Sequence, residues 1–303
     1  MRVAGIDLGT NTILMLIADV DNQGTILPIE DYHSIARLGE GLNLTGEIST
    51  AALDRTISIL SDYKNYIELH NVDKVFCVGT SALRDASNSK EVIDKIKERT
   101  GFSVEVINGE FEAYLSFLGT VENNKYSVVF DIGGGSTEII AGENQNIIFR
   151  KSFDFGVVKF TEKYISNHPP SQVTIKTIKK ELLDIFSSVG KDIVKGTIYA
   201  VAGTPTTIAA VVQGLQQYDR SKVDNYPLSL LEIRRAKEMF LSLSIEEIVR
   251  KLYVPPLRAD VITVGAIILE TFCEFFDLDN VIVSDKGLRY GIVKYYSQSN
   301  FSF

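Results

Sequence analysis

A short apolar run that enters a glycine turn and leaves as a second apolar run occurs twice in this sequence. Residues 2–8 lead into Gly9-Thr10-Asn11 and continue as the apolar residues 13–18. Residues 127–131 lead into Gly133-Gly134-Gly135-Ser136 and continue as residues 137–141. The run after the first turn is continuous and lacks helical spacing, so we expect a strand there and a β-hairpin at each turn. This argues against a dinucleotide site, where the glycine turn opens a helix.

The remaining pattern alternates helices and strands. Polar residues 122–125 are expected to separate two related α/β halves, with a cleft between them where the glycine turns gather. A third glycine turn, Val201–Thr206, follows a further strand. Helices are predicted at residues 49–70, 90–100, 110–120, 229–243 and 260–276, and strands at residues 75–79, 104–107, 147–153 and 280–284.

Composition is that of a soluble protein with room for two domains: 303 residues, 45% hydrophobic and 23% charged. The net charge of -8 argues against nucleic-acid binding through a large basic surface. It does not exclude a polyanionic substrate, which backbone amides, a metal ion and a few arginines can hold. Cys77 and Cys273 indicate neither a disulfide framework nor a metal quartet. Residues 261–276 contain two glutamates and are too short to span a bilayer, and no signal peptide is recognised, so we expect a cytoplasmic protein with no membrane partner.

The glycine turns are the candidate phosphate sites. Glycine permits positive φ and lets a ligand approach the backbone N–H groups of Gly133, Gly134, Gly135 and Ser136, while Asp131 can hold a divalent cation. A purely structural turn would need one or two glycines, so we favour phosphate binding.

The first turn carries the same chemistry in Asp7, Gly9, Thr10 and Asn11. Asp and Asn also occur in turns for local hydrogen bonding, so this turn alone is a weaker indication of phosphate binding. The presence of the second glycine turn makes the interpretation more convincing.

Three charged residues are further candidates. Arg84 follows a strand end and could bind phosphate, or could pair with Asp85 on the surface. Glu112 is a candidate general base, although Glu110 and Glu112 could simply favour a helix N-terminus. Glu138 could support a metal or could be a strand residue that points at solvent. The three histidines show no ligand spacing.

Five stretches together resemble the exopolyphosphatase/guanosine pentaphosphate phosphohydrolase (Ppx/GppA) family, within the actin, sugar-kinase and heat-shock ATPase superfamily. They follow the family's order over almost the whole chain. The matching stretches are Gly5–Thr12, Gly79–Ala86, Asp131–Glu138, Ala202–Thr204 and Val283–Arg289.

This resemblance implies two ribonuclease H-like domains, residues 1–121 and 122–289, with mixed sheets flanked by helices and the active site in the interdomain cleft. It also implies that the C-terminal helix, near residues 290–303, packs back onto the first domain. The implied reaction is Mg²⁺-dependent hydrolysis of a terminal phosphoanhydride in inorganic polyphosphate or pppGpp.

Residue roles follow from the same resemblance. Glu112, before Ala113, matches the general base, and Glu138 matches the acid at the end of the phosphate loop. Asp131 matches the metal-binding aspartate, and Asp7 is a second metal candidate from its own place before a glycine turn. Gly9, Thr10, Asn11 and Gly133–Ser136 match the phosphate-binding positions, and Arg84 stays a phosphate-binding candidate from its place after a strand end.

Two departures stand out: Phe111 lies where a second acid is common, and Tyr290 lies where another acid is common. Longer relatives carry helical C-terminal domains, so shorter polyphosphates or pppGpp are the expected substrates.

Two alternatives from other classes stay open at this point. One is an actin-like nucleotide-binding regulatory switch, which holds phosphates to set domain closure. The other is a kinase for a small hydroxyl compound. Both would bind ATP, and no motif decides whether an adenosine pocket exists. The oligomeric state, a homodimer included, is also open.

Overall fold

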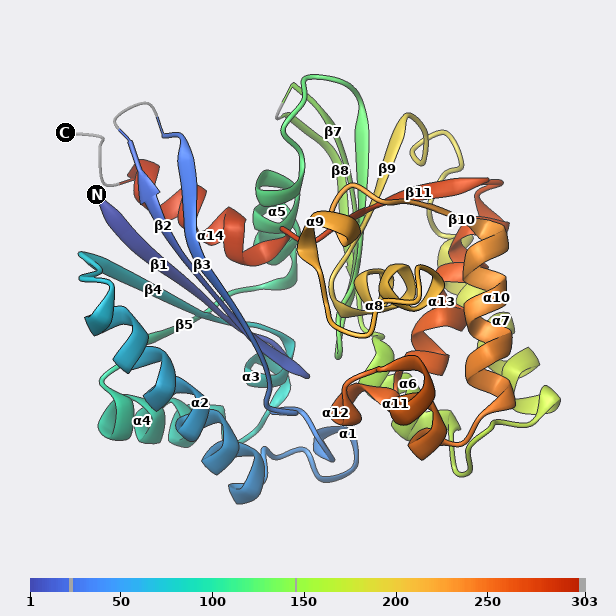
Figure 1. The fold of residues 1–303 in the computed structure, drawn as a ribbon, viewed down its shortest axis with the longest axis horizontal. Helices are drawn as coiled ribbons and strands as arrows, with labels where there is room; N and C mark the ends of the chain where they lie inside the picture. Colours follow the sequence, from blue (N-terminus) through green and yellow to red (C-terminus); the bar gives the residue numbers. More distant parts are fainter. Residues whose placement is uncertain (22–23, 145, 300–303) are drawn as a thin grey trace. The chain divides into compact units, whose positions relative to one another are not determined.

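A computed structural model describes residues 1–21, 24–144 and 146–299. The chain forms two compact units (Figure 1). The first contains residues 1–122, residues 134–136 and the C-terminal helix that follows Gly287. The second contains residues 123–133 and 137–286. Each unit is a mixed β-sheet flanked by helices, as predicted for the fold class.

The first unit contains a five-stranded sheet in the order β3-β2-β1-β4-β5. Strand β1 pairs antiparallel with β2, and β2 with β3, while β1, β4 and β5 run parallel. The sharp turn between β1 and β2 confirms the first predicted hairpin. The strands are β1 (Arg2–Leu8), β2 (Thr12–Val20), β3 (Ile26–Ile35), β4 (Lys74–Gly79) and β5 (Val104–Val106).

Helices cover both faces of this sheet. Because side chains alternate along a strand, Ala4, Ile6 and Leu8 of β1 join the core with α2 and α4, while Val3 lies in a second cluster with Tyr290 and Val293 of α14. Ser49 caps α2 by accepting from the Ala52 N–H. The helices are α1 (Leu42–Thr45), α2 (Thr50–Leu69), α3 (Ser81–Asp85), α4 (Ser89–Thr100), α5 (Gly109–Thr120) and α14 (Leu288–Ser299).

Helices α5 and α14 run alongside each other in backbone contact (Figure 1). A Cβ atom built on Gly291 would lie 2.5 Å from the Leu115 carbonyl carbon and closer still to its oxygen. A Cβ atom on Gly119 would lie 3.1 Å from the Gly291 Cα. Glycine is therefore required at this crossing because the two backbones leave no space for a side chain.

Replacing Gly291 with Ala is expected to destabilise the protein by about 1–3 kcal/mol, because the new methyl group meets backbone rather than a movable side chain. Urea denaturation measures the change. Gly190→Ala is the control, because the atom nearest to its new Cβ is the carboxylate of exposed Asp192, which can move. Equal stability of the Gly291→Ala protein and the wild type would contradict the close crossing.

The second unit repeats the arrangement in a six-stranded sheet, β10-β11-β9-β6-β7-β8. Strands β6, β7 and β8 form an antiparallel meander, β6, β9 and β11 are parallel, and β10 is an antiparallel edge strand. The strands are β6 (Ser127–Ile132), β7 (Thr137–Glu143), β8 (Asn146–Phe153), β9 (Thr197–Val201), β10 (Pro227–Ser229) and β11 (Asn280–Ser284).

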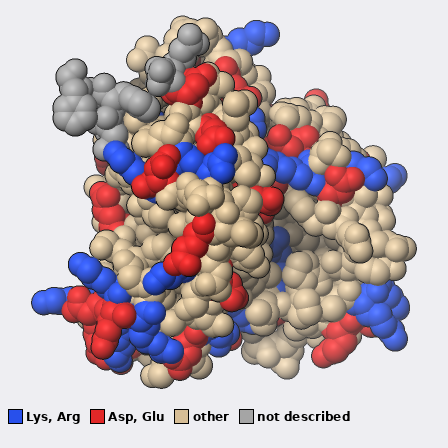
Figure 2. All heavy atoms as spheres, turned by 60° about the vertical axis from the view of Figure 1, so that its left-hand side comes forward, with Lys and Arg blue, Asp and Glu red and all other residues tan. Residues whose placement is uncertain are grey.

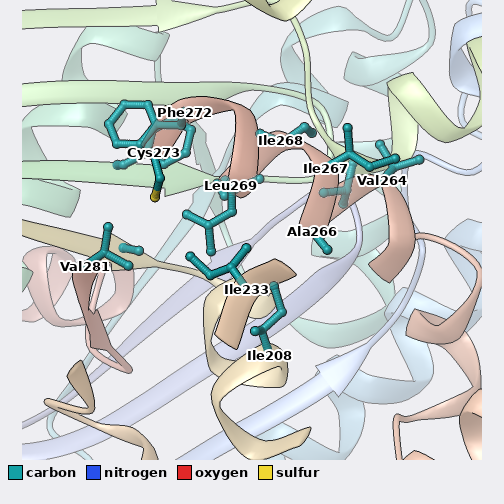
Figure 3. Close-up of a cluster of buried hydrophobic side chains, with 14 of the residues drawn as sticks. Ile208, Ile233, Val264, Ala266, Ile267, Ile268, Leu269, Phe272, Cys273 and Val281 are labelled. Atoms are coloured by element: carbon teal, nitrogen blue, oxygen red, sulfur yellow. The ribbon is translucent and has the colours of Figure 1, made fainter. Parts of the chain in front are cut away.

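One hydrophobic core joins this sheet to its helices. Helix α13 contributes a row of buried side chains, and Figure 3 shows Leu269 of this helix near Ile233 of α10, which in turn lies next to Ile208 of α8. The helices are α6 (Val157–Tyr164), α7 (Gln172–Phe186), α8 (Gly203–Val212), α9 (Arg220–Val223), α10 (Leu230–Ser242), α11 (Ile245–Leu252), α12 (Pro256–Ala259) and α13 (Ile262–Phe275).

The two sheets share one strand order around β1 and β6, which is the ribonuclease H-like arrangement implied by the sequence resemblance. Most predicted elements are present within one or two residues of their expected bounds. The sequence pattern did not predict β3, α6, α7, α8 and α11, or the short elements α1, α3, α9, α12 and β10.

The surface carries both signs of charge close together. On the face shown in Figure 2, acidic and basic side chains are interspersed. Many form local pairs, such as Arg99 with Asp54 at 2.8 Å and Lys95 with Glu91 at 2.5 Å. Within the described residues, no helix combines the length and apolar character needed to span a membrane.

Candidate active site

The first glycine turn is a compact, mostly buried structure at the end of β1. The Gly9 N–H donates to the Thr12 carbonyl at 3.0 Å and closes the turn. The Asn11 carbonyl accepts from the backbone N–H groups of residues 36 and 37, and the Thr10 carbonyl accepts from the Gly39 N–H at 2.9 Å. Asp7, Thr10 and Asn11 are each no more than 8% exposed, so three polar side chains are held in fixed positions here.

Part of the second glycine turn, residues 134–136, belongs to the same unit. A Cβ atom on Gly134 would lie 2.9 Å from the Thr10 Cβ, and one on Gly135 would lie 2.8 Å from the Thr10 hydroxyl oxygen and 3.1 Å from the Ser81 Cβ. The glycines therefore bring backbone close to Thr10 and Ser81.

The structure corrects one reason given for these glycines. Gly9, Gly134 and Gly135 do not adopt positive φ. Their value here is close approach, because a Cβ on Gly9 would also lie 2.8 Å from the Thr12 carbonyl oxygen.

Arg84 and Glu112 form an ion pair at 2.8 Å. Arg84 lies on α3, directly after β4, and also donates to the Ile107 carbonyl at 2.9 Å. Glu112 lies in the first turn of α5, which Asn108 caps by accepting from the Phe111 N–H. The Glu112 side chain is 12% exposed, so its carboxylate is held in a partly desolvated position.

This geometry excludes one local interpretation of Arg84. The ion-pair partner of Arg84 is Glu112 rather than Asp85, so the surface-pair alternative is wrong. Glu110, two residues before Glu112, is exposed, so the two acids at the start of α5 have different surroundings.

In the second unit, Asp131 and Glu138 lie directly opposite each other on β6 and β7. The alternating residues Phe130, Ile132 and Ile139 face the helical core, so the two acids share the other face of the sheet. Glu138 is 1% exposed and accepts a hydrogen bond from the Ser152 hydroxyl at 2.7 Å. The alternative that Glu138 points at solvent is therefore wrong.

These acids are suited to magnesium, which prefers carboxylate oxygens and is commonly held by one or two of them together with substrate phosphates and water. Over the described ranges, no group of three His, Cys, Asp or Glu side chains has the arrangement of an all-protein metal cage. The opposed pair Asp131 and Glu138 fits the first kind of site. Asp7 is the corresponding acid at the end of β1.

A third glycine turn follows β9, and it contains a residue that the sequence analysis missed. The Arg258 guanidinium lies against this turn, where a Cβ on Gly203 would be 2.9 Å from its carbon, and it donates to the Thr207 hydroxyl at 3.0 Å. Burial lowers the pKa of Arg258, and the nearby Tyr218 and Asp285 side chains oppose this shift only in part. In the sequence, Arg258 is an isolated arginine, and an isolated arginine is too weak a signal to predict a site residue.

The cysteines cannot act as nucleophiles at neutral pH. Burial, with a smaller contribution from the Asp7 charge, raises the pKa of the Cys77 thiol, and burial raises the pKa of Cys273 to about 12. Both thiols stay protonated and unreactive.

Comparison with known proteins identifies the family. The model of the Ppx/GppA phosphatase family matches residues 16–299. The chain belongs to the Ppx/GppA phosphatase family. The resemblance read from the sequence motifs is thus confirmed.

Relatives of this family member cover nearly all of the chain. Exopolyphosphatase 2 of Mycobacterium tuberculosis is 32% identical over 311 residues, which cover 96% of this chain and 97% of that protein. The crystal structure of the Ppx/GppA family member from Aquifex aeolicus has a TM-score of 0.81 and 32% identity, covering 99% of this chain and 98% of that one.

The bifunctional 3-dehydroquinate synthase/phosphatase of Fusobacterium nucleatum subsp. nucleatum is also 32% identical, over 96% of this chain. This chain spans only 46% of that protein.

Proposed function

We propose that this Ppx/GppA phosphatase is an exopolyphosphatase-type phosphohydrolase, which releases orthophosphate from the end of inorganic polyphosphate, from pppGpp, or from both. The observation that carries the proposal is the arrangement around the first glycine turn. There the Gly134–Ser136 segment lies against Thr10 and Ser81 in the same unit. Family membership and relatives described as exopolyphosphatases support it.

In this proposal the terminal phosphoryl group is held by backbone amides of Gly9, Thr10 and Asn11 and of Gly133–Ser136. Amide groups that a glycine leaves accessible are good donors to phosphate oxygens. Arg84 adds a positive charge on the side of Glu112.

Glu112 is the proposed general base. Its carboxylate orients a water molecule and takes its proton as the water attacks the phosphorus in line with the leaving phosphate. The ion pair with Arg84 fixes the direction of the carboxylate before the substrate binds. Because the departing phosphate is a good leaving group, alignment and charge stabilisation supply most of the acceleration.

Asp131, Glu138 and Asp7 are the proposed ligands and supports of a magnesium ion. When bound, the ion would neutralise charge on the transferring phosphoryl group. Glu138 is buried and bonded to Ser152, so its role is to orient and support, while partly exposed Asp131 is better placed to coordinate.

The test is a substrate panel with defined chain lengths. Purified protein is incubated with tripolyphosphate, long-chain polyphosphate, pppGpp or ATP, with and without Mg²⁺, and released orthophosphate is measured. We expect Mg²⁺-dependent release from polyphosphate or pppGpp. Release from neither substrate, together with tight ATP binding, would overturn the proposal in favour of a nucleotide-dependent switch. Transfer from ATP to an added hydroxyl compound would favour a kinase.

A further inference from the structure

Helix α5, which carries Glu112, is held along its whole length by α14. At its C-terminal end, Gly119 meets the backbone of Gly287 and Gly291. In its middle, Leu115 packs with Leu288 and Ile292 in one buried cluster. Since both helices are twelve residues long and antiparallel, the last turns of α14 reach the first turn of α5.

The contact at the first turn is aromatic. The Tyr295 ring meets Phe111 edge to face, with centroids 5.0 Å apart and an interplanar angle of 78°. It meets Tyr114 in the same manner at 6.0 Å and 87°. Phe111 is the residue directly before Glu112, so Tyr295 holds the turn from which the Glu112 side chain projects.

The aromatic row continues to the sheet. Tyr295 meets Tyr296 at 5.1 Å, and Tyr296 stacks on Phe76 of β4 at 5.1 Å and 20°. Strand β4 also leads directly into α3, which carries Arg84. The first turn of α5 is therefore connected to β4 by two sets of contacts. One is the ion pair with Arg84, which follows β4, and the other is the aromatic row from Tyr295 through Tyr296.

We infer that Tyr295 is a positioning residue for Glu112: its ring fixes the first turn of α5, and so the direction of the carboxylate, without touching the substrate. The inference rests on the proposed role of Glu112 as general base. An ion pair alone restrains one side chain, whereas the ring contact restrains the backbone that carries it. Small displacements of a catalytic group lower kcat far more than they lower substrate binding.

The experiment measures kcat and KM for orthophosphate release in Tyr295→Phe, Tyr295→Leu and Tyr295→Ala. We expect Tyr295→Ala to lower kcat by about 10–100-fold with KM within about twofold of wild type, and Tyr295→Phe, which keeps the ring, to retain activity. Tyr295→Leu fills most of the volume without the ring and should be intermediate. In a Glu112→Gln background, Tyr295→Ala should cause no further loss, because the residue acts through Glu112.

Tyr164→Ala is the matched control, since Tyr164 makes a similar edge contact with Phe160, at 5.4 Å and 84°, on α6 of the second unit. It should change stability without changing kcat. Wild-type kcat in both Tyr295→Ala and Tyr295→Leu, or a further loss of activity in the Glu112→Gln background, would overturn this inference while leaving the proposed function standing. Wild-type turnover in Glu112→Gln alone would instead remove the general base, and with it the premise.

Discussion

Replacing Glu112 with Gln is expected to lower kcat for orthophosphate release by about 10²–10⁴-fold, with little change in substrate affinity. Gln has nearly the same shape and can still accept a hydrogen bond from Arg84, but it cannot take a proton from water. The affinity should survive because the proposed phosphate contacts come from the glycine turns and Arg84. Steady-state kinetics with polyphosphate, combined with direct binding measurements on the variant, separate the two effects.

Glu110→Gln is the matched control for this variant. Glu110 lies in the same first turn of α5 but is exposed, whereas the Glu112 side chain is 12% exposed and paired with Arg84. The two variants remove the same charge from the same helix N-terminus, so any general effect of the helix dipole is common to both. Equal activity of the two variants would show that Glu112 is not the base.

The hairpins could be predicted because their signal is local. Continuous apolar runs on both sides of Gly9 and Gly133 fit a strand better than a helix. Helices α2 and α4 could be predicted for similar reasons, since Ser49 is an N-cap and Gly101 ends α4 at a φ of 85°. These features depend on neighbours within a few residues.

The missed elements lack such signals. Strand β3 lies at the edge of its sheet, and its residues are exposed or half-buried. It also contains Pro28, which an edge strand tolerates but which argues against a strand when only the sequence is known. Helix α7 follows a polar segment with two prolines, which resembles a loop in sequence. In both cases, tertiary context rather than local pattern determines the structure.

The candidate site was predictable in its residues but not in its contacts. Arg84 follows the end of a strand, and Glu112 lies at the start of a helix. Both patterns are common in proteins, and neither predicts that the two side chains meet. Their pairing across 28 positions depends on how β4, β5 and α5 follow one another in the first unit. The expectation that Asp7 and Asp131 hold a metal ion stays a prediction.

One residue that the structure alone reveals as important is Asp31 on β3. It binds Arg289 of α14 through two hydrogen bonds, at 2.6 and 2.8 Å, and Arg289 is only 3% exposed. Tyr290 donates to the same carboxylate at 3.3 Å. This pair anchors α14, and so the support of α5, to the edge of the sheet.

The pKa of Asp31 makes this anchor dependent on pH. Burial by itself raises the pKa of the carboxyl, but the hydrogen bond with His33 and the charge and hydrogen bonds of Arg289 outweigh it and hold the pKa well below its usual range. Above pH ~4, the carboxyl is ionised in the folded and unfolded states alike, and its stabilising contribution is complete. Below pH ~4, only the unfolded state takes up the proton, so the contribution is lost as the pH falls toward the folded-state pKa.

Asp31→Asn is therefore expected to lower the free energy of unfolding by about 3–5 kcal/mol at pH 7, because it removes the negative charge that the buried Arg289 guanidinium binds through two hydrogen bonds. The difference from wild type should shrink when urea denaturation is repeated at pH 3. Asp54→Asn removes the same group from an exposed pair with Arg99, in which both side chains are more than half exposed, and should cost no more than about 1 kcal/mol. A difference for Asp31→Asn that matches this control, or that stays constant with pH, would show that the Arg289 pair does not anchor α14.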